Sequence, residues 1–131
     1  MRGDISPPII GIPLDGNNST ALVPDTDHGA LDGDVVVDRA VGPMQVIPST
    51  WRIVARDGNG DKVEDPNNVF DAALTAATYL CRAAPAGLTA DPALQAAFFS
   101  YNHSEPYSLT ALHWSKVYDA FRPPKDPIVP G

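Results

Sequence analysis

Apolar residues follow different patterns on the two sides of residue 41. In residues 1–41, Pro, Gly, Asn and Asp interrupt every apolar run within a few positions, as at Pro7-Pro8 and Asp32-Gly33. Such interruptions are typical of turns and short extended segments. After residue 41, apolar residues recur at helical spacing behind helix start signals. We therefore predict a mainly α fold class, with an irregular arm over 1–41, about four helices over 42–122 and a flexible tail over 123–131.

Each expected helix starts at a proline or at a side chain that can cap a helix. These starts are Pro48 in PSTWRIVA, Asp65-Pro66, Asp91-Pro92 and Ser104. The second helix is well marked, because its apolar residues share one helical spacing. They are Val69, Phe70, Ala73, Leu74, Ala77 and Leu80. This helix should end near Arg82, and Cys81 inside it should be buried.

Composition and charge exclude several classes of function. The net charge is -7 and the pI is near 4.6, so no basic surface is available to neutralise the phosphates of a nucleic acid. No apolar run approaches the roughly 20 residues that a membrane-spanning helix needs. Residues 1–14 also lack the unbroken apolar stretch of a signal peptide. At 131 residues, we expect one domain without a membrane span.

The segment AVGPMQVIPSTW, residues 40–51, carries the first candidate site. Gly42 permits close backbone approach and Pro43 stiffens the next step, so Met44 and Gln45 would be presented from a constrained loop. An amide has both donors and an acceptor, which suits the hydroxyl and acetamido groups of a sugar. In the competing interpretation, Met44 belongs to the core and Gln45 caps a turn. The residues alone leave both interpretations open.

A second candidate pair, Tyr101 and Asn102, lies in SYNHSEPY, again an aromatic residue beside an amide. Three blocks occur in order along the chain: PDTD to IPSTW over residues 24–51, NVFDAALTAATYLC over 68–81, and YNHS over 101–104. Together they resemble the sugar-binding motifs of lytic transglycosylases with a goose-type lysozyme-like fold. The likeness is strongest to the peptidoglycan (murein) transglycosylases of actinobacterial type.

That resemblance implies a partial α+β lysozyme-like fold and a cleft for peptidoglycan glycan strands. Met44 and Gln45 would line the cleft, Tyr101 would lie near the scissile bond, and Asn102 would anchor the loop or contact sugar. Enzymes of this family cleave the bond between N-acetylmuramic acid and N-acetylglucosamine to give 1,6-anhydro products. The family also implies an extracellular or cell-envelope location.

The glutamic acid that such enzymes use as the proton donor is not found at the expected place. It belongs to a helix upstream of the Gly-x-Met-Gln loop, whereas the chain has only Glu64 and Glu105. A general acid needs a pKa raised by partial burial, which a loop carboxyl lacks. We expect the C-terminal portion of a transglycosylase, inactive as this chain. Glu105 and Asp32 remain as lower-ranked acids, and a catalytically silent murein-binding module is the alternative.

The stretch DGNGDKVEDPNN, residues 57–68, carries oxygen ligands at alternate positions, as an EF-hand calcium loop does. The ligands would be Asp57, Asn59 and Asp61. Lys62 stands where the loop prefers glycine, and Asn68 stands at the twelfth position, where a bidentate Glu is expected. Two interpretations remain open: a weak Ca²⁺ site, which would suit a calcium-dependent interaction module, and a plain Asp-Gly-Asn-Gly turn.

Overall fold

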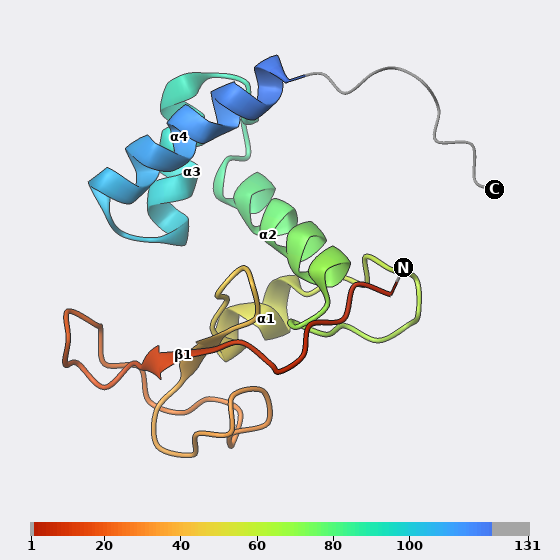
Figure 1. Ribbon diagram of the computed structural model, residues 1–131. Helices are drawn as coiled ribbons and strands as arrows, with labels where there is room; N and C mark the ends of the chain where they lie inside the picture. The colour runs from red at the N-terminus through yellow and green to blue at the C-terminus, as the bar shows by residue number, and fades with distance from the viewer. Residues whose placement is uncertain (1, 122–131) are drawn as a thin grey trace. The chain divides into compact units, whose positions relative to one another are not determined.

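A computed structural model describes residues 2–121 of the chain. Its elements follow the order β1 (Ile10–Pro13), β2 (Arg39–Val41), α1 (Pro48–Val54), α2 (Val69–Ala83), α3 (Asp91–Tyr101) and α4 (Glu105–Ala120) (Figure 1). The predicted fold class is confirmed: the protein is mainly helical, with an irregular N-terminal arm ahead of the helices. The tail predicted over 123–131 lies outside the described residues. None of the helices between residues 2 and 121 has the length and apolar character needed to cross a bilayer.

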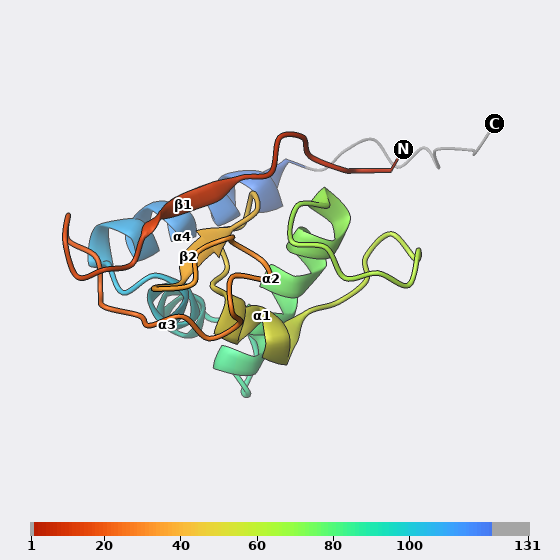
Figure 2. The same cartoon turned by 90° about the horizontal axis from the view of Figure 1, so that it is seen from below.

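The chain forms two compact units, Met1–Tyr79 and Leu80–Gly131. Their division falls within α2, whereas the sequence texture changes at residue 41. In the first unit the arm is bound to the later segments. β1 pairs antiparallel with β2 in the register Ile10 to Val41, with an irregularity before Pro13 (Figure 2). A further bridge joins Asp4 to Asn68, so the arm is part of the unit that contains α1.

The helix starts confirm two predictions and correct two. α1 begins at Pro48, and Ser104 caps α4 by accepting a hydrogen bond from the Tyr107 backbone N–H. α2 begins at Val69 instead of Pro66, because Asn68 supplies the cap: its Oδ1 accepts from the N–H groups of Phe70 and Asp71. In α3, Asp91 is the first helical residue and not the cap.

The core of the first unit combines small apolar side chains with polar ones. Its buried apolar residues include Val41, Val46, Val54 and the indole of Trp51. The side of α2 that is buried contains Asp71, Ala72, Thr75 and Ala76. The apolar residues that marked this helix in the sequence include Val69, Phe70 and Leu74, which are all exposed. Cys81 is exposed too, so the prediction of its burial is wrong.

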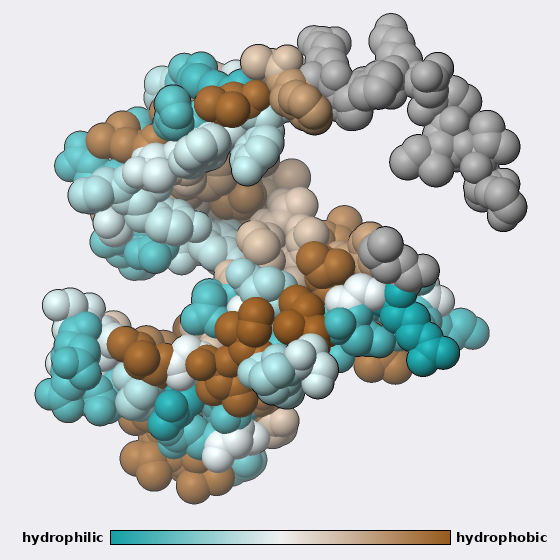
Figure 3. Space-filling view, in the orientation of Figure 1, coloured by the Kyte–Doolittle hydropathy of each residue, from teal (hydrophilic) through white to brown (hydrophobic). Residues whose placement is uncertain are grey.

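The second unit is built on a helical hairpin in which α3 packs beside α4 (Figure 1). Lys116 of α4 forms an ion pair with Asp91 at the start of α3, at 2.7 Å. Ala97 and Ser108 are its buried residues within the described range. Large apolar and aromatic residues of α4 are exposed, among them Leu109, Trp114 and Tyr118. Figure 3 shows brown, apolar surface over this helical hairpin.

Candidate functional site

The loop Gly42–Gln45 is closed at its base by two backbone hydrogen bonds. The Val41 N–H donates to the Val46 carbonyl at 2.9 Å, and the Val46 N–H returns a bond of 3.2 Å. Gly42 adopts a φ of +73° and lies directly against the carbonyl of Pro66, so a Cβ atom there would collide with that carbonyl. The close backbone approach predicted from the sequence is therefore present, and it fixes the loop ahead of α1.

Gln45 occupies the last position of this loop, with a φ of 51°. Its Nε2 donates to the Gly42 carbonyl at 2.9 Å, which gives Gln45 the turn-capping role of the competing interpretation. The side chain is nevertheless exposed, and its Oε1 lies over the backbone of Gly11 in β1. Met44 is 38% exposed and so does not belong to the core. The loop thus presents a braced amide beside an apolar side chain.

The second candidate pair lies at the end of α3. Tyr101 is the last helical residue and is half-buried, while Asn102 is the exposed C-cap. The Asn102 N–H donates to the Phe98 carbonyl, and its own carbonyl accepts from the Ser104 N–H at 2.6 Å. Both bonds are made by backbone atoms, so the role expected of the Asn102 side chain stays a prediction. Met44 and Gln45 belong to the first unit, whereas this pair belongs to the second.

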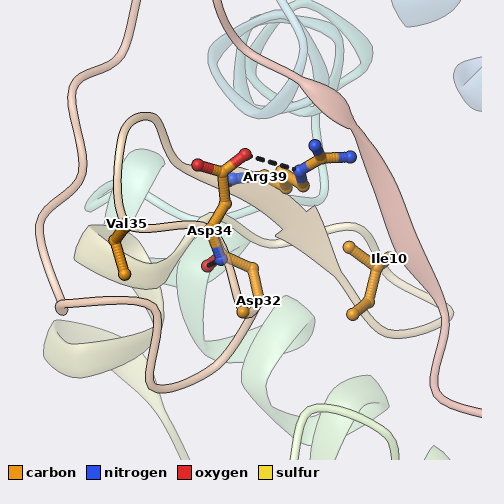
Figure 4. Close-up of a pocket in the computed structure, with 6 residues that line it drawn as sticks. Ile10, Asp32, Asp34, Val35 and Arg39 are labelled. Atoms are coloured by element: carbon orange, nitrogen blue, oxygen red, sulfur yellow. Dashed lines mark hydrogen bonds and ion pairs between the residues drawn. The ribbon is translucent and has the colours of Figure 1, made fainter.

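A hollow of about 470 Å³ lies in the first unit and contains Asp32 (Figure 4). It is lined by Ile10, Asp32, Gly33, Asp34, Val35 and Arg39. Asp32 is only 5% exposed, and its two carboxylate oxygens accept the backbone N–H groups of Asp34 and Arg39. These bonds hold the ends of the 32–39 loop, which is a structural role for the carboxylate.

Asp34 is the second acid of this hollow, and it faces Arg39 in Figure 4. The N–H groups of Val36 and Val37, followed by the Arg39 guanidinium, hold the pKa of Asp34 below its ordinary value. The Arg39 Nε to Asp34 Oδ2 distance is 2.9 Å. Because a general acid must retain its proton at neutral pH, Asp34 is unsuited to protonate a glycosidic oxygen.

Both glutamates of the chain are exposed. Glu64 lies in the loop before α2, and Glu105 is the first residue of α4, where a carboxylate interacts favourably with the helix dipole. Glu105 also lines a second hollow, of about 410 Å³, between α3 and α4. Neither glutamate has the partial burial that would raise its pKa enough for a general acid.

The 57–68 loop brings three carboxylates together, but not the three ligands predicted. Oxygens of Asp57, Asp61 and Asp71 lie within 4.8 Å of one another. Asn59 instead bonds to Asp61 through its side chain. Lys62 adopts the φ of +68° that favours glycine at this position. The loop is a partial match to a calcium loop in which Asp71 supplies a carboxylate beyond the expected twelfth position.

The same loop is also well held by hydrogen bonds from its own backbone. Asp57 accepts from the N–H groups of Gly60 and Lys62, each at 2.7 Å. Asp71 accepts from Gly58, Asn59 and Asp65 and is fully buried. These bonds account for the loop's shape as a turn, so calcium binding stays a prediction.

Two buried acids hold loops, a role that the sequence did not assign to them. Asp71 entered the sequence analysis only as one residue of the 68–81 block. The spacing Asn68-x-x-Asp71 resembles a capping box, and this signal could have identified Asp71 as a residue of the helix start. Asp38 is fully buried and accepts the Thr26 N–H and hydroxyl at 3.0 and 2.6 Å. Its carboxylate also lies within 4.8 Å of those of Asp25 and Asp27. The sequence shows all three acids in the same acidic arm, but no local signal predicted that they meet, because they come together only through folding of the arm.

Comparisons with models of protein families, with curated proteins and with solved structures find no match to this chain. The resemblance to lytic transglycosylases therefore rests on the three sequence blocks.

Proposed function

We propose that this chain forms part of the glycan-binding cleft of a peptidoglycan lytic transglycosylase and does not cleave glycan as the isolated chain. The observation that carries the proposal is the Gly42–Gln45 loop. It lies within the first sequence block, it is braced by Pro66, and it presents the Gln45 amide at the surface. On this proposal the chain acts outside the cell or in the cell envelope, where peptidoglycan is found.

The expected lack of cleavage follows from the acids of the described residues. Glu64 and Glu105 are exposed, and the pKa of Asp34 lies below its ordinary value. Asp32 is buried, but both its oxygens accept backbone N–H bonds. The role of proton donor suits a carboxyl that is partly buried and whose oxygens are not already accepting backbone N–H bonds, and none of these groups meets both conditions. The catalytic acid of the proposed enzyme would come from sequence outside this chain.

The first experiment measures cleavage and binding with purified murein sacculi. We expect the chain to sediment with sacculi and to release no 1,6-anhydromuropeptides, detected by mass spectrometry. Release of those products would contradict the proposed inactivity, and Asp32→Asn and Glu105→Gln would then locate the acid. Failure to sediment with sacculi would contradict the binding proposal itself.

The role of Gln45 is tested by Gln45→Asn, which shortens the side chain but tolerates the positive φ. Loss of one sugar hydrogen bond should weaken binding by about 1 kcal/mol, or about fivefold. His28→Asn is the matched control, because His28 is exposed in the same unit at a φ of 56°. Equal binding by the two variants would remove Gln45 from the site.

The alternative proposal is a catalytically silent murein-binding module. It predicts the same binding and the same lack of products. The two proposals separate on the DNA preceding the codon for Met1. An in-frame segment encoding an amphipathic helix with Glu-Ser would favour the enzyme, whereas a stop codon would favour the binding module.

A further inference from the structure

The two hollows of the protein differ in how their polar side chains are used. In the first, Asp32, Asp34 and Arg39 bond to one another or to nearby backbone. In the second, between α3 and α4, no hydrogen bond or ion pair within residues 2–121 holds the Gln95 amide or the Glu105 carboxylate. The second hollow therefore offers polar groups that a ligand can use.

The second hollow combines apolar and polar side chains. It is lined by Pro92, Gln95, Ala96, Phe99, Glu105 and Ser108, and its volume is about 410 Å³. Binding sites for small molecules commonly enclose about 300–1,000 Å³ and are mostly apolar with a few polar groups. The Phe99 ring is 44% exposed, and its orientation is supported by the His103 ring, whose centroid lies 5.5 Å away.

Helical spacing explains why these residues meet. Gln95 and Phe99 lie four positions apart on α3, so they share one face of that helix. Glu105 and Ser108 lie three positions apart on the facing helix. Ser108 is 1% exposed, and its hydroxyl donates to the Glu105 carbonyl at 2.9 Å, so it is already bonded within the first turn of α4. The Lys116 to Asp91 ion pair joins the two helices and neutralises the neighbouring acid.

We propose that this hollow binds a pyranose ring of a neutral N-acetyl amino sugar. An aromatic ring offers a flat apolar surface for the apolar face of a sugar, while an amide and a carboxylate can bond its hydroxyl and acetamido groups. The Glu105 charge repels a sugar that carries a free carboxylate. The hollow thus selects N-acetylglucosamine over N-acetylmuramic acid with a free lactyl group. The choice of sugar rests on the proposed function, whereas the site itself lies in the other unit.

The test is an NMR titration of the ¹⁵N-labelled full chain with two disaccharides. Chitobiose, which contains two N-acetylglucosamine units, is compared with the same disaccharide carrying a lactyl ether on both rings, so that every ring of the second ligand bears a carboxylate. We expect chitobiose to shift the amide signals of Gln95, Phe99 and Ser108. Phe99→Ala should weaken its affinity roughly five- to tenfold, from the loss of the aromatic surface. Tyr118→Ala is the matched control, because Tyr118 is a 69% exposed aromatic residue of the same unit outside the hollow.

Glu105→Gln tests the charge. Because the Glu105 carboxylate also contacts the sugar, the readout is the ratio of the two affinities. The preference for chitobiose over the carboxylate-bearing disaccharide should fall about threefold or more in this variant. Unchanged chitobiose binding by a folded Phe99→Ala variant would overturn the proposal, as would equal affinity of the native chain for both disaccharides. Shifts confined to the Gly42–Gln45 loop would also overturn it while leaving the proposed function standing. Shifts confined to α3 and α4, with no effect of Gln45→Asn, would support the hollow and remove the loop from the proposed function.

Discussion

Replacement of Gly42 by alanine tests whether the Gly42–Gln45 loop is as tightly braced as the structure indicates. Residue 42 has a φ of +73°, which costs an L-residue about 1–2 kcal/mol. The added Cβ would also collide with the Pro66 carbonyl, so the backbone must move. That movement endangers the hydrogen bond from the Gly42 N–H to the Ile9 carbonyl, which is 2.8 Å long. With about 1 kcal/mol for that bond and about 1 kcal/mol or more of strain, Gly42→Ala should cost at least about 3 kcal/mol.

Gly33→Ala is the matched control that isolates the steric part of this cost. Gly33 has a φ of +77°, but nothing lies within 4 Å of a Cβ placed there. Gly33→Ala should therefore lower the free energy of unfolding only by the cost of placing an L-residue at a positive φ, about 1–2 kcal/mol. For a unit of this size, the thermal midpoint should fall by about 5–10 °C for Gly33→Ala and by more than about 15 °C for Gly42→Ala.

The assay is thermal and urea unfolding followed by tryptophan fluorescence in a Trp114→Phe background. The signal then comes from Trp51, which is buried in the same unit as Gly42. Equal destabilisation by the two alanine variants would refute the reasoning, because it would mean that the Pro66 carbonyl yields freely. If a folded Gly42→Ala chain binds sacculi as well as the native chain, the contact between Gly42 and Pro66 is not needed for glycan binding.

Three other predictions concern the cap of α2, an acidic loop and the calcium loop. Asn68→Ala should lower the free energy of unfolding by about 2–4 kcal/mol in urea titrations, because Asn68 is buried, caps α2 and bonds to the Arg2 carbonyl. A smaller effect than that of Asn17→Ala, at an exposed turn, would contradict it. The folded pKa of Asp34 is lowered, so its stabilisation is present above its unfolded pKa and is lost as pH falls. The difference in thermal unfolding midpoint between the native chain and Asp34→Asn should therefore shrink as pH falls from about 5 to 2. A difference that stays constant over this range would show that the Asp34 carboxylate is not its source. With a Kd near 1 mM, 1 mM Ca²⁺ should add only about 0.4 kcal/mol, reversed by EGTA and absent in Asp57→Asn. A calcium shift retained in that variant would rule out the loop as the site.

Local signals in the sequence predicted the helices better than their exact starts. Pro48 and Ser104 mark starts correctly, because a proline at the first position and a serine cap act within a few residues. Asp65 resembles a cap equally well, but its Oδ1 accepts from the Asn67 N–H and its own N–H donates to Asp71. Asn68 takes the cap because the folded arm also bonds to its side chain. The choice between two capping residues was thus decided by tertiary contacts.

The candidate site shows the same limit. The sequence indicated that Gly42 allows a close approach, yet the partner, Pro66, is distant in the chain and was not foreseen. The amide chemistry of Gln45 was foreseen, but not that its Nε2 also caps the loop. Likewise, Gln95 and Phe99 share a helix face by spacing alone, whereas their meeting with Glu105 depends on how α3 and α4 pack.

The buried acids explain why hydrophobic pattern is a poor guide to the core of the first unit. Asp38 and Asp71 are fully buried without an ion-pair partner among the described residues. Asp38 accepts two hydrogen bonds, both from Thr26, and Asp71 accepts three backbone N–H bonds. Burial of a charged group is tolerated only when such bonds replace its water. Each carboxylate therefore organises a loop around itself, Asp38 in the arm and Asp71 before α2. Because the loops depend on these bonds, Asp71→Asn should destabilise this unit more than Asp61→Asn, whose carboxylate is exposed; equal unfolding midpoints would show that hydrogen bonding to Asp71 does not hold the loop.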